Sequence, residues 1–178
     1  MKAKVPIIPM EDFMRNPEKS SFQISPNGNY VAFMKPWKTR MNVFVKDMKT
    51  NKEERVTASE KRGIYGFTWL KNNRIGYVKD DGGDENIHLY AININGTNEI
   101  DLTPFENIQA RIIDDLENDK DHLLIGLNRR NPEIHDPYRV NINDGTMEMI
   151  AENPGNISGW GTDHNGKLRI ATTSDGVN

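Results

Sequence analysis

The stretch NVFVKDMKTNKEERVT, residues 42–57, recurs without a gap as HLYAININGTNEIDLT, residues 88–103. The offset of 46 positions aligns Thr57 with Thr103. A third copy, PYRVNINDGTMEMIA, follows at residues 137–151 after a small insertion. Self-similarity at a fixed period decides the architecture, because each copy is expected to fold into the same supersecondary unit.

A second unit precedes each of these copies. FQISPNGNYVAF, residues 22–33, aligns with FTWLKNNRIGYV, residues 67–78, and residues 115–127 and 159–172 follow the same pattern. Each unit reads as two short alternating strands around a tight turn. Asn-Gly or Asp-Gly pairs, which supply the positive φ of primed hairpin turns, lie at residues 27–28, 95–96, 144–145 and 165–166.

Four strands in each period of about 46 residues are typical of β-propeller blades. The sequence therefore predicts an all-β fold, a β-propeller fragment with about three and a half four-stranded blades over residues 1–178. The expected blades cover about residues 20–58, 63–105 and 109–154, with a half blade at 157–178. Propellers close about four to eight blades into a ring, so we expect the chain to be part of a longer protein.

Helix is expected in one place. Residues 10–17 predict a short N-terminal helical turn that ends before Pro17. Residues 106–118 have some helical character, but they occupy the position of a blade's first strand, and we predict a strand there.

Composition excludes several classes of protein. The net charge is −3, with 23 basic and 26 acidic residues well mixed, whereas a nucleic-acid partner requires a clustered basic face. No window approaches the roughly 18 apolar residues of a membrane-spanning helix, so no membrane partner is expected. The chain has no Cys, which excludes disulfides and thiolate nucleophiles. No signal peptide is recognised near Pro6 and Pro9, so we expect a cytoplasmic protein, or a periplasmic one if a leader was removed.

The N-terminal stretch IPMEDFMRNPEKSSFQISPNGNYVAFMKP, residues 8–36, resembles the start of the propeller domain of the prolyl oligopeptidase family of serine peptidases. The similarity is to the bacterial acylaminoacyl-peptidase and dipeptidyl-peptidase branch. Ser25-Pro26-Asn27-Gly28 stands where that family has a recurrent SPDG hairpin. DGGDENIHLYAININGTNEIDLTPF, residues 81–105, looks like the family's second blade.

The resemblance implies a C-terminal α/β-hydrolase domain that holds a Ser nucleophile in a G-x-S-x-G elbow, followed by Asp and His. No Ser of this chain lies in such an elbow. We therefore expect no catalytic residue, cofactor or metal in the chain itself, and a peptidase as the parent protein. The implied role is to gate and orient peptide substrates for its own hydrolase domain.

The stretch KDDGGDENIHLYAI, residues 79–92, is the most acidic turn of the chain. It reads as an inter-strand connection in which Gly supplies unusual backbone angles. A second hypothesis is a substrate or interdomain loop that contains Asp84, Glu85 and Asn86, since functional residues concentrate on loops. A third is calcium bound by acidic side chains, although their spacing is not that of an EF-hand. In the matching turn of the third blade, Arg129 and Arg130 could bind a carboxylate such as a peptide terminus.

Two other functions remain open at the level of sequence. One is a TolB-like propeller that binds a protein partner without catalysis, and the other is a propeller enzyme with its own site, such as a lyase. The blade count also suggests a twofold homodimer of half-propellers, because two such fragments would complete a ring.

Overall fold

The computed structural model describes residues 7–15, 17–71, 73–80, 82–83 and 85–173. Within them the chain forms three four-stranded sheets and a two-stranded sheet, and hydrogen-bonded neighbours in each sheet follow one another in sequence. All strand pairs are antiparallel. The predicted all-β fold class is therefore confirmed.

The strands have the following bounds. The first sheet contains β1 (Ser20–Ile24), β2 (Tyr30–Trp37), β3 (Arg40–Asp47) and β4 (Glu53–Arg55), and the second contains β5 (Gly66–Leu70), β6 (Arg74–Lys79), β7 (His88–Asn93) and β8 (Ile100–Asp101). The third contains β9 (Ala110–Asp114), β10 (His122–Asn131), β11 (Ile134–Asn141) and β12 (Met147–Met149), and the last contains β13 (Ile157–Thr162) and β14 (Leu168–Thr173).

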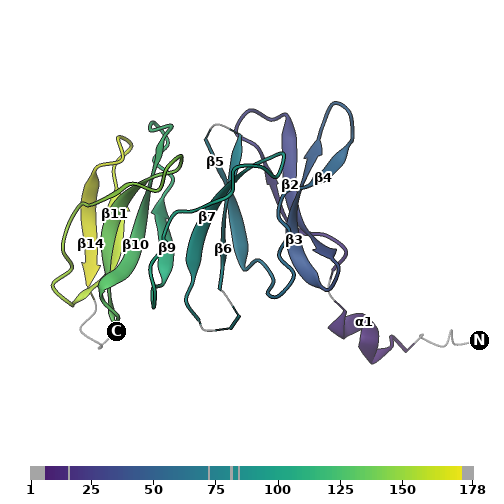
Figure 1. Cartoon of the computed structure of the whole chain (residues 1–178), viewed down its shortest axis with the longest axis horizontal. Coiled ribbons are helices and arrows are strands. Elements are labelled where there is room, and N and C mark those ends of the chain that lie inside the picture. Colours follow the sequence, from purple (N-terminus) through teal and green to yellow (C-terminus); the bar gives the residue numbers. More distant parts are fainter. Residues whose placement is uncertain (1–6, 16, 72, 81, 84, 174–178) are drawn as a thin grey trace, which may run out of the picture.

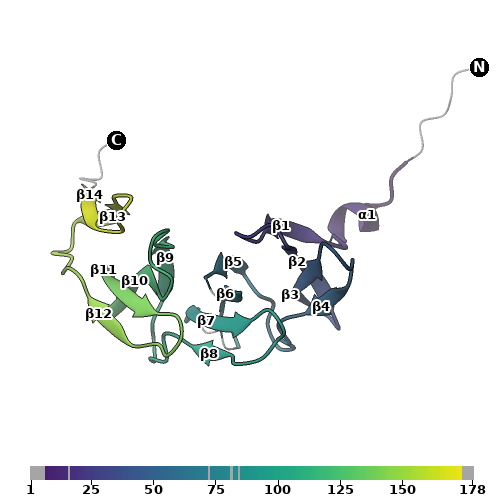
Figure 2. The same ribbon diagram turned by 90° about the horizontal axis from the view of Figure 1, so that it is seen from above.

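The sheets stand side by side in an open arc (Figure 1). Seen from above, β1, β5 and β9 line the concave side of the arc, and β4, β8 and β12 lie on its outer side (Figure 2). The one helix among the described residues, α1 (Met10–Met14), projects from the first sheet and lies within the predicted helical turn. Strand β9 confirms the strand predicted in residues 106–118. No described helix combines the length and hydrophobicity that crossing a bilayer requires.

The core lies between neighbouring sheets. In β7, Leu89 and Ala91 are fully buried against the third sheet, whereas Tyr90 and Ile92 pack toward the first. Alternate residues of a strand point to opposite faces, so the middle sheet is covered on both sides. Each fully buried Leu or Ile side chain stabilises the fold by about 1.5–3 kcal/mol.

The 46-residue period is also visible in space. The Trp69 indole donates a hydrogen bond to the carbonyl of Gln23 at 3.2 Å, across the first two sheets and 46 positions apart. Asn118 donates to the carbonyl of His164 at 2.8 Å, again 46 positions apart. Residues about one period apart thus touch across neighbouring sheets, as expected when copies of one unit stack against each other.

Arg74 joins the second sheet to the third from a buried position. Its guanidinium donates to the carbonyl of Ile142, which directly follows β11, and to that of Ala91 in its own sheet at 3.1 Å. Carbonyl acceptors satisfy part of the hydrogen-bonding capacity of this buried cation, which would otherwise be costly to desolvate.

The hairpin turns correct one expectation. Gly28, Gly96, Gly145 and Gly166 have the expected positive φ, between 71° and 79°. The preceding Asn or Asp residues do not, so these are not the primed turns that require positive φ at both central residues. In the first turn the Gly28 N–H donates to the Ser25 carbonyl at 2.9 Å. The Gly therefore closes the turn in the left-handed conformation, which it adopts without a Cβ penalty.

Candidate functional site

Connections between the second and third strands of each four-stranded sheet lie at one edge of the molecule. The β6–β7 and β10–β11 connections both appear along the lower edge in Figure 1. The sequence predicted substrate or interdomain contacts in both places. The placement of Arg129 and Arg130 in a loop was wrong, because pairing with β11 extends β10 to Asn131 and both arginines lie near the end of that strand. Antiparallel pairing places the turns between first and second strands at the opposite edge.

The acidic β6–β7 loop is only partly described, because Asp81 and Asp84 lie outside the described residues. Glu85 is exposed and has a φ of 61°, and its carbonyl accepts a hydrogen bond from Gln109 at 3.5 Å. Asn86 is half-buried next to Ile87, whose carbonyl accepts a hydrogen bond from the Ala110 N–H at 2.8 Å. The end of this loop is thereby joined to the third sheet.

Asp80 is the first residue of the β6–β7 loop, and its side chain is buried. It is 2% exposed, and one carboxylate oxygen accepts from Nε of Arg62 at 3.0 Å. The Arg62 guanidinium lowers the pKa of this carboxyl below its ordinary value. Asp80 therefore links the connection before β5 to the end of β6. No group of three or more acidic or His side chains suited to a metal is found among the described residues.

The two arginines of the β10–β11 region have different surroundings. The Arg129 guanidinium is exposed and lies 3.9 Å from the centroid of the Phe105 ring. Arg130 makes two hydrogen bonds of 3.0 Å to the carboxylate of Asp136 and one of 2.8 Å to the carbonyl of Asn153. Hydrogen bonding to Asp136 raises the pKa of Arg130. Arg130 thus already binds a carboxylate within the chain, whereas Arg129 faces solvent.

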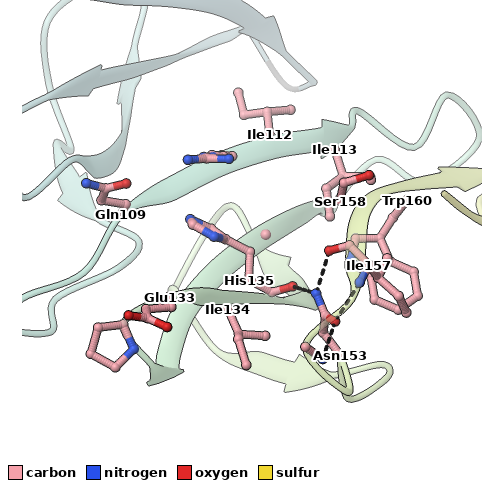
Figure 3. Close-up of a pocket in the computed structure, with 15 residues that line it drawn as sticks. Gln109, Ile112, Ile113, Glu133, Ile134, His135, Asn153, Ile157, Ser158 and Trp160 are labelled. Atoms are coloured by element: carbon pink, nitrogen blue, oxygen red, sulfur yellow. Dashed lines mark hydrogen bonds between the residues drawn. The ribbon is translucent and has the colours of Figure 1, made fainter. Parts of the chain in front are cut away.

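A cleft of about 600 Å³ lies between the third sheet and the two-stranded sheet (Figure 3). Its wall includes Trp160 and isoleucines from both sheets. Arg111 from β9 and His135 from β11 add polar groups. Burial lowers the pKa of His135, and the charge of Arg111 acts in the same direction. Analysis of the sequence missed these two residues as a pair, because neither lies in a motif and only the pairing of strands within the third sheet brings them to one cleft.

The arc of four-stranded antiparallel sheets defines a β-propeller region. No family model matches the chain. Among curated proteins, it is 30% identical over 170 residues to dipeptidyl aminopeptidase BIII of Pseudoxanthomonas mexicana. It is 26% identical over 160 residues to dipeptidyl peptidase family member 6 of Caenorhabditis elegans. These matches cover 94% and 84% of the chain but only 25% and 21% of the relatives.

Solved structures share the fold at lower identity. The propeller domain of the trilobed protease from Pyrococcus furiosus matches with a TM-score of 0.57 and 14% identity, over 90% of this chain and 55% of that one. TolB from Acinetobacter baumannii matches with a TM-score of 0.58 and 14% identity, over 90% and 39%. An oligogalacturonate lyase matches with a TM-score of 0.66 and 13% identity, over 92% and 50%.

Together these findings confirm the resemblance noted in the sequence. The chain is homologous to the propeller region of the dipeptidyl aminopeptidases and acylaminoacyl peptidases of the prolyl oligopeptidase family. It spans about a quarter of the length of the curated relatives it matches.

Proposed function

We propose that this chain is the N-terminal propeller part of a serine exo- or oligopeptidase, in which it gates and orients short peptides for a separate hydrolase domain. The observation that carries this proposal is the 30% identity to dipeptidyl aminopeptidase BIII over 94% of the chain. The chain has no Ser in a G-x-S-x-G elbow, so the proposal assigns hydrolysis to the remainder of a longer protein.

An exposed apolar segment near the N-terminus supports contact with a hydrolase domain. Ile7, Met10, Phe13 and Met14 are each at least 69% exposed, and α1 has no buried residue. Large apolar side chains that gather on a surface mark interaction sites, because their exposure to water is unfavourable. A domain that packs against the lower edge of the propeller would cover this segment.

The β6–β7 loop and the adjacent end of β10 are the proposed peptide-facing elements, with Glu85, Asn86, Arg129 and Arg130 as the residues concerned. Exposed charges on Glu85 and Arg129 would orient the termini of a peptide. Arg130, which is paired with Asp136, would hold the β10–β11 turn in place.

The test uses the full-length product of the gene. We expect it to hydrolyse chromogenic dipeptide substrates and to be inhibited by reagents that modify an active serine. In the same protein, Glu85→Gln is expected to raise KM a few-fold with little change in kcat, since it removes a binding charge only. Glu117→Gln is the matched control, because Glu117 is exposed on the β9–β10 turn at the opposite edge.

Two outcomes would count against the proposal. A full-length product without peptidase activity would favour the non-enzymatic, TolB-like binding propeller. Equal effects of Glu85→Gln and Glu117→Gln would leave a peptidase but remove the proposed role of the β6–β7 loop.

A further inference from the structure

The cleft between the third sheet and the two-stranded sheet has the size and lining of a small-ligand site. Its volume of about 600 Å³ falls within the range of such sites, roughly 300–1,000 Å³. Ile113, Ile134, Ile157 and Trp160 contribute apolar surface. The lining side chains come from β9, β11 and β13 and from the connections next to them (Figure 3). Binding sites of this kind combine a mostly apolar wall with a few polar groups that set orientation.

Arg111 is the distinctive polar group of this cleft. It is exposed, and within the described part of the chain it forms neither an ion pair nor a hydrogen bond. Every other arginine is bonded to a carboxylate or a carbonyl or is stacked on an aromatic ring. A guanidinium offers a fork of N–H donors that matches a carboxylate in two parallel hydrogen bonds. The Arg111 guanidinium is therefore available to bind the anionic group of a ligand.

His135 supports the same interpretation. Its Nε2 atom is buried and has no hydrogen-bond partner within the described residues. Burial and the charge of Arg111 both lower the pKa of His135, which disfavours a second cation beside Arg111 in the cleft. Glu133 also lines the cleft, but it forms no ion pair with Arg111. The positive charge of Arg111 is thus not neutralised by a neighbouring described side chain.

We infer that this cleft binds the free carboxylate of a short peptide with apolar side chains, and that Arg111 pairs with that carboxylate. The isoleucines and Trp160 would receive the apolar side chain next to the carboxylate. This inference rests on the proposed function and deepens it, since it adds Arg111 in the cleft to the loop and strand charges, Glu85 and Arg129, that would hold a peptide. It concerns binding by this chain alone and involves no hydrolytic step.

The experiment titrates the purified 178-residue chain with N-acetyl-Leu-Leu by calorimetry, with tryptophan fluorescence as a second signal because Trp160 lines the cleft. The C-terminal amide of the same dipeptide, which lacks the negative charge, is the comparison ligand. We expect the amide to bind about tenfold or more weakly, as loss of a charge-assisted hydrogen bond predicts.

Arg111→Gln is expected to weaken binding of the acid about tenfold or more and to remove the preference for the acid over the amide. Arg40→Gln, at an exposed arginine that begins β3, should leave both affinities unchanged. Circular dichroism of each variant verifies that the chain remains folded. If the isolated chain does not fold, the same two dipeptides are titrated into the full-length protein.

Equal affinities for acid and amide, or an Arg111→Gln variant that binds like the wild type, would overturn the inference. Hydrolysis by the full-length protein is measured separately. A peptidase that shows no carboxylate preference at the cleft would therefore retain the proposed function and lose only this site.

Discussion

At the residue scale, buried polar side chains at matching positions of different repeats make equivalent hydrogen bonds to the backbone. Asn42 and Asp136 occupy matching positions of β3 and β11, and both are fully buried. An oxygen of Asn42 accepts from the Ser59 N–H at 2.7 Å, and one of Asp136 accepts from the Asn153 N–H at 2.7 Å. Each side chain ties the segment that leaves its sheet back to the third strand. The two repeats therefore share the same hydrogen-bonding role at this position, although the side chain is neutral in one (Asn42) and charged in the other (Asp136).

The charge of Asp136 leads to a stability prediction. Asp136→Ala would remove both carboxylate hydrogen bonds of Arg130 to residue 136 and leave the Asn153 N–H without its acceptor. Because Asp136 is fully buried whereas the Arg130 side chain is 35% exposed, the main cost is the buried Asn153 N–H that loses its acceptor, and we expect a loss of about 1–3 kcal/mol in the free energy of unfolding. Urea denaturation measures this loss.

The control for this prediction is Glu152→Ala. Glu152 also approaches Arg130, at 3.4 Å, but its side chain is 64% exposed. Exposed ion pairs contribute about 0–1 kcal/mol. If Asp136→Ala and Glu152→Ala lower the free energy of unfolding by similar amounts, the hydrogen bonds of Asp136 do not stabilise the fold as proposed.

At the element scale, one threonine follows the fourth strand of each of the first two sheets. Thr57 accepts a hydrogen bond from the Val43 N–H at 2.9 Å, and Thr103 accepts one from the Leu89 N–H at 3.0 Å. Both threonines are at most 1% exposed. The hydroxyl thus satisfies a buried backbone donor of the third strand just where the fourth strand ends.

Thr57→Val and Thr103→Val test this element. Each keeps the shape of the side chain but leaves a buried N–H without its hydroxyl acceptor, so we expect each to cost about 1–3 kcal/mol. The loss at Thr57 should be the larger of the two, because its hydroxyl also donates a buried hydrogen bond to Asn42 at 2.9 Å. Thermal or urea unfolding of both variants measures them. Thr173→Val, at an exposed position of β14, should change stability by less than about 0.5 kcal/mol. A loss near that of the control would contradict the role of the hydroxyl.

At the scale of the whole molecule, the sheets form an arc whose neighbours share cores and a few polar links, such as Arg74 with Ile142. Many acidic side chains within it have a lowered pKa. They are Asp47, Glu53, Asp80, Asp119, Asp136, Asp144 and Asp163.

The twofold homodimer of half-propellers, suggested by the blade count in the sequence, stays a prediction.

Among these carboxyl groups, that of Asp119 has the most strongly lowered pKa. Burial alone would raise the pKa of its carboxyl, but hydrogen bonds from His122, the Asp121 N–H and Arg139 outweigh burial and lower the pKa well below its ordinary value. A carboxyl with a lowered folded-state pKa stabilises the fold above its unfolded pKa and loses that contribution as the pH falls. The free energy of unfolding should therefore decline below about pH 4.

Urea unfolding between pH 7 and pH 2 measures this decline. Asp119→Asn should be less stable at pH 7 and should show a smaller further loss in acid, because the group that titrates is gone. Asp115→Asn, an exposed neighbour, is the matched control. An acid profile of Asp119→Asn parallel to that of the wild type would contradict the assignment.

The sequence by itself determined the strands, their grouping in fours and the family resemblance. This was possible because the repeat spacing and the alternation of apolar residues are local properties, visible in pairs such as Thr57 and Thr103. It also indicated which loops connect second to third strands, although it misjudged the turn geometry around Gly28.

Only the tertiary structure decided the chemistry of individual side chains. Arg129 and Arg130 are adjacent in sequence, yet one stacks on Phe105 and the other is held by Asp136. Arg111 and His135 are 24 positions apart and meet only because β9 and β11 belong to one sheet. Whether a charge is free or paired depends on which strands pack together, and that packing is a long-range property of the whole arc.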